Sequence, residues 1–194
     1  MAQHTHSPGR FFVIGIFMIL AIIMADQYSK WFVLETMLRS SDVALTPFKD
    51  WFFTSNEISI FEDMREEYNT VAITSFMDFV MVWNRGISFG MLQNGGNLMT
   101  MGLIFLAIIV SLFLIIYMVL TNRMLINISS GMIAGGAIAN TIDRIRFGAV
   151  ADFIDIHVNG MHWPAFNIAD AAIAVGATIF IITTLMTPKN NAQK

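Results

Sequence analysis

The chain has 194 residues, of which 56% are hydrophobic and only 13% are charged. Soluble globular domains carry about 25% charged residues, so this composition predicts a surface that meets lipid rather than water. The net charge of −3 gives no indication of nucleic-acid binding, and the lack of cysteine excludes disulfides, thiolate catalysis and cysteine-ligated zinc or iron–sulfur sites.

Four apolar stretches are long enough to cross a bilayer, whose hydrocarbon core of about 30 Å needs about 20 helical residues. The first contains Asp26 and Lys30 in its second half, the second contains no charge, and the fourth contains only Asp170. The predicted spans are residues 11–34, 98–120, 127–147 and 166–187.

The start of the first span is ambiguous. Arg10 followed by apolar residues as far as Ala25 is similar to a cleavable secretory signal peptide. The apolar character resumes at residues 31–34, beyond any cleavage point, which favours a retained first helix.

Charge favours an orientation with both termini in the cytoplasm. The cytoplasmic segments then contain basic residues and no acidic ones, although Lys and Arg are also frequent outside. The main outer region is predicted at residues 35–97, in which the partial alternation of residues 70–83 indicates one or two strands. The charged run at 62–67 is interpreted as a solvated loop. We expect a single domain over residues 1–187 and a short cytoplasmic tail at 188–194.

Asp152 and Asp170 are the candidate catalytic pair. Asp152 follows the third predicted span, Asp170 lies about one turn into the fourth, and a short loop is expected between these antiparallel helices. The facing ends of the helices lie at one membrane depth, so the two carboxylates can meet. Two such groups share one proton near neutral pH, which supplies a general base and a general acid for peptide hydrolysis.

Polar and small residues on the third span suggest support for this pair. Their spacing of three or four predicts a shared helix face for Gly136, Asn140, Asp143 and Arg144. An ion pair between Asp143 and Arg144 is as compatible with a structural role as with catalysis. Small residues recur every four positions at Gly131, Gly135 and Ala139, which predicts close helix packing.

Asp26 and Lys30 are four residues apart on the first helix and can pair. One interpretation is an interfacial salt bridge with Lys30 extending outward to the membrane surface. The other is a role in binding substrate, since ionisable residues within membrane spans are usually functional.

Two other classes of function fit some of these residues. Intramembrane charges also occur in proton-coupled transporters and channels, although here they gather at the outer end of the spans. A metal-dependent lipid enzyme would use Asp143, Asp152 and Asp155 as oxygen ligands, the last two lying three residues apart and able to share one face. The chain contains neither H-E-x-x-H nor G-x-S-x-G, so zinc-peptidase and serine mechanisms have little support.

Four short elements resemble those of lipoprotein signal peptidases (signal peptidase II), in the family's order. They are residues 26–30 (DQYSK), 84–90 (NRGISFG), 136–155 (GAIANTIDRIRFGAVADFID) and 166–170 (FNIAD). The last two elements together are highly specific.

The resemblance implies an all-α membrane protein with four transmembrane helices, a small extramembrane β-cradle and a loop region. It implies that Asp152 and Asp170 are the catalytic dyad of an aspartic endopeptidase. Supporting or substrate-contacting roles are implied for Asp26, Lys30, Asn84, Gly86, Gly136, Asn140, Asp143, Arg144 and Asn167.

The resemblance also implies the reaction and its setting. Such enzymes remove the signal peptide from diacylglyceryl-modified prolipoproteins, cleaving before the lipidated Cys, without metal or cofactor. The expected partners are these precursors, membrane lipid and globomycin-type cyclic peptide inhibitors, and the expected form is a monomer. The expected location is the bacterial inner (cytoplasmic) membrane, with the active site at the periplasmic face. One departure is the stretch at 38–78, which is longer than the family's usual link.

Overall fold

The computed structural model describes residues 9–39, 44–53, 69–86 and 96–186. The helices are α1 (Phe12–Phe32), the π-helix η1 (Val33–Leu38), α2 (Phe48–Phe53), α4 (Gly96–Leu120), α5 (Met124–Phe147) and α6 (Ile168–Leu185). The strands are β1 (Val71–Thr74), β2 (Met77–Asn84), β3 (Val150–Val158) and β4 (Met161–His162).

Within these described ranges, four helical segments are long and apolar enough to cross a membrane. They are Phe12–Leu38, Leu98–Leu120, Met124–Phe147 and Ile168–Leu185. The four predicted spans are therefore confirmed, with ends that differ by a few residues. The first span is longer than predicted because η1 continues α1 directly.

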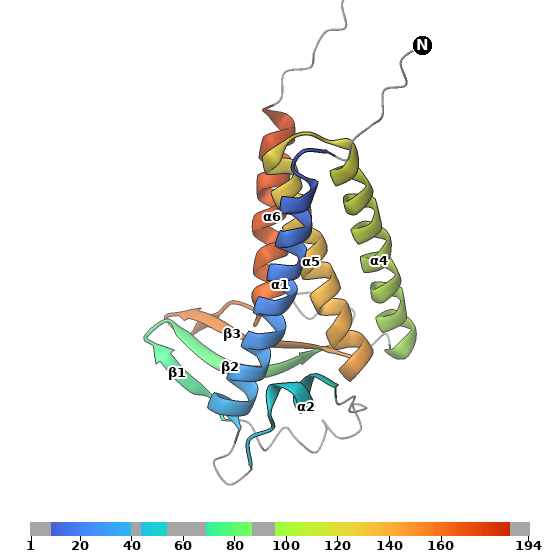
Figure 1. Ribbon diagram of the computed structural model, residues 1–194. Coiled ribbons are helices and arrows are strands. Elements are labelled where there is room, and N and C mark those ends of the chain that lie inside the picture. Colours follow the sequence, from blue (N-terminus) through green and yellow to red (C-terminus); the bar gives the residue numbers. More distant parts are fainter. Residues whose placement is uncertain (1–8, 40–43, 54–68, 87–95, 187–194) are drawn as a thin grey trace, which may run out of the picture.

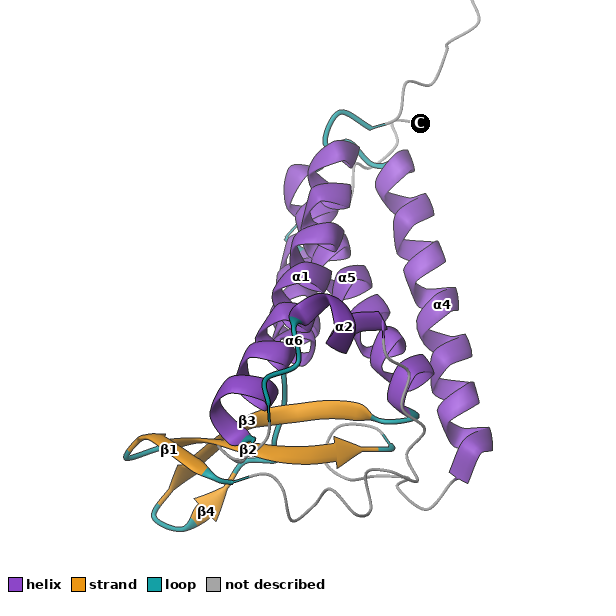
Figure 2. Ribbon diagram, turned by 60° about the horizontal axis from the view of Figure 1, so that its bottom comes forward, coloured by secondary structure: helices purple, strands orange, loops and turns teal. Residues whose placement is uncertain are grey.

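The four long helices lie side by side, with the sheet and α2 gathered at one end of the bundle (Figures 1 and 2). The start of α1 lies at the opposite end, where the backbone N–H of Gly9 donates to the carbonyl of Val119 at 3.1 Å. The end of α6 lies at that same end (Figure 1). This arrangement brings the sheet-facing ends of α1, α5 and α6 to one level.

Helix α5 packs against α1 through glycines that allow close approach. A Cβ atom on Gly131 would lie 2.5 Å from the carbonyl oxygen of Gly15, and one on Gly135 would lie 2.9 Å from that of Ile19. The close packing predicted from the small residues of the third span is therefore confirmed.

Gly136 makes the equivalent contact with α6. A Cβ atom there would lie 2.5 Å from the carbonyl oxygen of Ala169 and 2.8 Å from Cγ1 of Ile173. The neighbour at 2.5 Å is backbone, so a larger residue has to move α6. Ala169 immediately precedes Asp170, and this helix contact therefore bears directly on the candidate site.

We expect Gly136→Ala to destabilise the protein by about 1–3 kcal/mol, the usual cost of overpacking. The displaced start of α6 should also lower activity. Gly102→Ala is the matched control, because nothing lies within 4 Å of the Cβ position at Gly102 on the outer surface of α4. Thermal unfolding in detergent measures the stability of both variants. Equal melting temperatures would contradict the α5–α6 contact.

The sheet has the order β1-β2-β3-β4, with each neighbouring pair antiparallel. The first two strands confirm the prediction for residues 70–83. The short loop expected between the third and fourth spans is wrong, because β3 and β4 occupy this segment. Strand β3 forms because it pairs with the distant β2, in a register that places Asp152 opposite Val82 and Val150 opposite Asn84.

Residues 40–43 and 54–68 of the long link that departs from the family pattern, including the charged run at 62–67, lie outside the described residues. Its described part contains α2, whose Trp51 packs against Phe147 at the end of α5. The guanidinium of Arg146 lies 4.3 Å from the centre of the Trp51 ring. These contacts fix α2 to the sheet end of the bundle.

Candidate active site

Asp152 is the third residue of β3 and is 1% exposed. Both of its carboxyl oxygens accept hydrogen bonds from side-chain amides. Nδ2 of Asn84, on β2, donates to Oδ2 at 3.0 Å, and Nδ2 of Asn167 donates to Oδ1 at 2.7 Å. Two separate elements therefore hold this carboxyl group in a fixed orientation.

Asp170 lies in the first turn of α6 and is partly exposed. The helix begins after Asn167, whose side-chain oxygen caps it by accepting from the backbone N–H of Asp170 at 2.9 Å. Oδ1 of Asp170 accepts from Nδ2 of Asn140, on α5, at 2.8 Å. Nδ2 of Asn167 also approaches Oδ1 of Asn140 at 3.2 Å.

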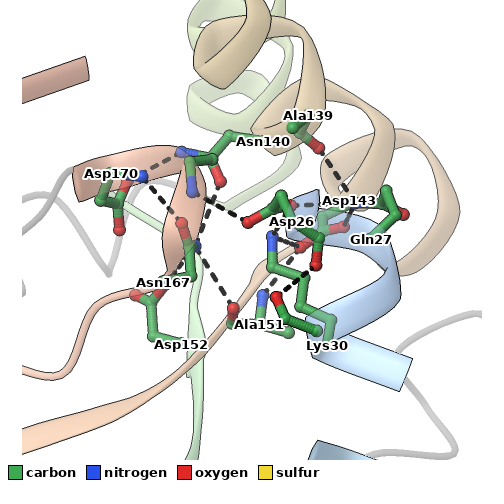
Figure 3. Close-up of polar contacts among 12 residues, drawn as sticks. Asp26, Gln27, Lys30, Ala139, Asn140, Asp143, Ala151, Asp152, Asn167 and Asp170 are labelled. Carbon is green, nitrogen blue, oxygen red and sulfur yellow. Dashed lines mark hydrogen bonds and ion pairs between the residues drawn. The ribbon is translucent and has the colours of Figure 1, made fainter. Parts of the chain in front are cut away.

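Asn167 thus contacts both members of the candidate pair, through its amide nitrogen to Asp152 and through its oxygen to the backbone of Asp170. Figure 3 shows the two carboxyl groups on either side of this side chain. Residues 18 apart in sequence are therefore brought to one site, although by a strand and a helix start rather than by a helical hairpin.

The environment of Asp152 favours its protonated form. Burial is the main cause and raises the pKa of Asp152 from 3.8 to about 8, with a further contribution from the negative charge of Asp170. The hydrogen bond from Asn84 and the charge of Lys30 act in the opposite direction but are smaller. The pair therefore retains a proton at neutral pH.

Arg144 supports the site from the side of β2. Its guanidinium donates to the carbonyl of Gly86 at 3.0 Å, and the backbone N–H of Gly86 donates to Oδ1 of Asn84 at 3.0 Å. The proposed pairing of Arg144 with Asp143 is replaced by these contacts, because Asp143 forms an ion pair with Lys30 at 2.6 Å.

The shared face predicted for the third span is confirmed for Gly136, Asn140 and Arg144 and is wrong for Asp143. Asn140 points toward α6, like Gly136, whereas Asp143 points toward α1. The reason is that residue 143 continues the row formed by Gly131 and Gly135, at intervals of four residues, which faces α1.

Lys30 lies within the protein and does not extend to the membrane surface. Its side chain is 0% exposed, and Nζ lies 2.7 Å from Oδ2 of Asp26 and 2.6 Å from Oδ2 of Asp143. The predicted Asp26–Lys30 pair is confirmed, but the outward extension of Lys30 is wrong, since a second carboxylate on α5 balances its charge inside the bundle.

Two polar residues that sequence reasoning did not select also take part. Gln27 is 1% exposed, and its Nε2 donates to Oδ1 of Asp143 at 2.8 Å. Arg146 donates to the side-chain oxygen of Gln27 at 3.1 Å. The signal for Gln27 is a polar amide within an apolar span, where an unpaired amide is costly.

The metal-dependent alternative does not fit this geometry. Asp155 contacts His162 at 2.8 Å, and the separation of three residues places it on the face of β3 opposite to Asp152. Among the residues that the structure describes, no group of three or more His, Cys, Asp or Glu side chains is arranged to hold a metal ion.

An apolar pocket of about 250 Å³ adjoins Asp170. It lies beside the first turns of α6 and the segment that precedes this helix. The lining residues are Trp163, Pro164, Ala165, Phe166, Asp170, Ala171 and Ala174.

Comparison with known proteins gives consistent results. Residues 18–186 match the family model described as signal peptidase (SPase) II. A lipoprotein signal peptidase of Anaplasma marginale (strain Florida) is 34% identical over 178 residues, covering 90% of this chain and 85% of that protein. A lipoprotein signal peptidase of Serratia marcescens is 34% identical over 170 residues, covering 87% of this chain and 83% of that protein.

The fold has a solved counterpart as well. A bacterial membrane enzyme determined by the in meso method at 2.3 Å resolution superposes with a TM-score of 0.69 at 21% identity. The superposition covers 98% of each chain.

Proposed function

The chain belongs to the signal peptidase (SPase) II family, and from this premise we propose that it removes signal peptides from prolipoproteins by an aspartyl mechanism. The proposed scissile bond precedes a diacylglyceryl-modified Cys. The proposed dyad is Asp152 and Asp170. The observation that carries the proposal is the contact of one buried side chain, Asn167, with both of these residues.

The roles of the two aspartates follow from their surroundings. Asp152 is the more buried, with a pKa of about 8, and in this proposal it holds the shared proton. Asp170 is partly exposed beside the apolar pocket, where a carboxylate can meet substrate and water. Asp170 therefore acts as the general base and Asp152 as the general acid in the first step.

The reaction then needs no group beyond the dyad and one water. Asp170 takes a proton from water, and the water oxygen attacks the scissile carbonyl carbon. Asp152 donates its proton to the carbonyl oxygen. The tetrahedral intermediate collapses when its C–N bond breaks. The leaving nitrogen takes a proton from Asp170, and Asp152 recovers one from the hydroxyl group, which restores the dyad.

The surroundings of the dyad suit a precursor held in a membrane. Asp26 and Lys30 lie in the second half of α1, Asp143, Arg144 and Arg146 near the end of α5, and Asp170 in the first turn of α6. This gathering at the sheet end supports a reaction near one face of the membrane rather than a transport path. We propose that this face is the periplasmic side of the inner membrane, with both termini in the cytoplasm. The apolar pocket beside Asp170 accommodates apolar parts of the substrate.

Cleavage by the purified protein tests the proposal directly. A precursor carrying a diacylglyceryl-modified Cys is incubated with the protein in lipid vesicles, and the products are identified by mass spectrometry. We expect cleavage immediately before the modified Cys, unchanged by chelator and blocked by globomycin. The unmodified precursor is the control. Equal cleavage of both precursors, or a requirement for added metal, would contradict the proposal.

The pKa of Asp152 gives a prediction for the alkaline side of the pH–rate profile. Above a pH of about 8 Asp152 loses the shared proton, so kcat/KM, which reports the free enzyme, should fall about tenfold per pH unit. The raised pKa of Asp152 in the folded state also contributes to the free energy of unfolding. This stabilising contribution is fully present below pH 4 or so and is lost as the pH rises to about 8. Initial rates from pH 5 to about pH 10 measure the first effect, and a flat alkaline limb would contradict a shared proton.

A further inference from the structure

A second group of buried polar side chains lies directly behind the candidate dyad. It consists of Asp26, Gln27, Lys30 and Asp143, and we call it the Lys30 cluster. Figure 3 shows this cluster beside the group formed by Asp152, Asn167, Asp170 and Asn140. Asp26, Lys30 and Asp143 are each 0% exposed and Gln27 is 1% exposed, so the cluster has no access to substrate.

The two carboxylates of the Lys30 cluster have matching sets of donors. Asp26 accepts from Nζ of Lys30 at 2.7 Å and from Nε2 of Gln27 at 3.2 Å. Asp143 accepts from Nζ of Lys30 at 2.6 Å and from Nε2 of Gln27 at 2.8 Å. Lys30 and Gln27 therefore join α1 to α5 by bridging the same two carboxylates.

The third donor to each carboxylate is a backbone N–H, and its position is informative. Asp143 accepts from the backbone N–H of Ala151 at 3.1 Å, and Ala151 immediately precedes Asp152. Asp26 accepts from the backbone N–H of Ala169 at 2.9 Å, and Ala169 immediately precedes Asp170. The cluster is thus bonded to the chain one residue before each member of the dyad.

We propose that the Lys30 cluster is a positioning device that fixes the separation and relative orientation of Asp152 and Asp170 through the backbone of Ala151 and Ala169. This inference rests on the proposed function, because it assigns a role only if the two aspartates act together. The cluster touches no reacting atom, so its residues are positioning residues rather than catalytic ones.

The cluster also influences the charge of the dyad. The groups that face Asp152 are the carboxylate of Asp170 on α6, the ammonium of Lys30 on α1 and the guanidinium of Arg144 on α5, with the amides of Asn84 and Asn167. The positive charge of Lys30 lowers the pKa of Asp152. Carboxylate oxygens of Asp26 and Asp143 lie 2.7 and 2.6 Å from Nζ of Lys30, so their opposite charge weakens the field of Lys30 at the dyad. Changing the net charge of the cluster should therefore move the alkaline limb of the pH–rate profile.

Asp143→Asn is the first test variant. Lys30 and the backbone N–H of Ala151 both contact Oδ2 of Asp143, and Gln27 donates to Oδ1. Asn is neutral and has one acceptor oxygen, so the ion pair with Lys30 is lost. In either orientation its NH2 group faces a donor, which displaces the side chain and the backbone bonded to it. We expect kcat to fall about 100-fold, as a misplacement of about 1 Å can cause, with KM unchanged. The alkaline limb should move to lower pH by on the order of one unit, because the charge of Lys30 is then less compensated.

The double variant Lys30→Met/Asp143→Asn separates charge from geometry. It leaves a single carboxylate, Asp26, which keeps its hydrogen bonds from Gln27 and the backbone N–H of Ala169. The net charge of the cluster is then that of the original protein, so we expect the alkaline limb to return to its original position while kcat stays low. Lys30→Met alone leaves two buried carboxylates without a cation and is expected to fold poorly, so it is not used. Glu35→Gln is the matched control, since it removes a partly buried ion pair with Arg39 at the end of the same span. Its kcat and alkaline limb should be those of the original protein.

The outcomes distinguish this inference from the function on which it rests. If Asp152→Asn and Asp170→Asn abolish cleavage but Asp143→Asn keeps its kcat and alkaline limb, the positioning role alone is wrong. Thermal unfolding first shows that Asp143→Asn and the double variant are both folded. The same conclusion follows if the alkaline limb of the pH–rate profile then lies at the same pH in the two variants. If Asp152→Asn and Asp170→Asn still cleave at the original rate, the proposed function itself fails.

Discussion

Asp152→Asn and Asp170→Asn are each expected to lower kcat by about 10²- to 10⁴-fold. Asn has nearly the shape of Asp but neither accepts nor releases a proton in this reaction. At position 170 the substitution removes the base that activates water, and at position 152 it removes the acid that protonates the carbonyl oxygen. Cleavage of a lipid-modified precursor, measured as initial rates in vesicles, gives both numbers.

Asp155→Asn is the control for these two variants. It lies on the same strand as Asp152, and it pairs with His162 rather than with the dyad. We expect its rate to equal that of the original protein. The double variant of Asp152 and Asp170 should be hardly slower than either single variant, because residues that act as one unit lose their effect together. Strictly multiplicative losses, or a normal rate for either single variant, would exclude a dyad.

The sequence predicts the four spans well because each is decided by local composition. Residues 98–120 form the plainest case, since a stretch of this length without charge has no stable place in water. Strand β3 was not predicted because its pairing with β2 is non-local. The residues that determine it, Asn84 and Val150 among them, are far apart in the chain.

The candidate site was predicted in its residues but not in its connections. Spacing alone pairs Asp26 with Lys30, and the structure keeps that pair. It adds Asp143 from another helix, and the burial of Lys30 depends on this second carboxylate. The direction in which Asp143 points is set by the packing of α5 on α1, which no local pattern encodes. A polar residue in an apolar span therefore indicates that a partner exists without identifying it.

Asn167 connects these arguments, because its side chain has two separable tasks. Its oxygen caps α6 by accepting from the N–H of Asp170, and its amide nitrogen donates to Oδ1 of Asp152. The first task stabilises the helix start, and the second orients the buried acid. Loss of the amide also leaves Oδ1 of Asn140 without this donor. Substitutions that keep one task and remove the other should therefore have different effects on stability and on rate.

Asn167→Ser keeps the cap, because Ser is a favourable residue at the start of a helix, but it loses the amide donor. Asn167→Ala loses both. We expect both variants to lower kcat about 100-fold, since the orientation of Asp152 is lost in each. Only Asn167→Ala should lose a further 1 kcal/mol or so of stability from the missing cap. Thermal unfolding in detergent and initial cleavage rates measure the two effects separately. A normal rate for Asn167→Ser would show that capping is the only task of Asn167, and the contact that carries the proposed dyad would then have no role in catalysis.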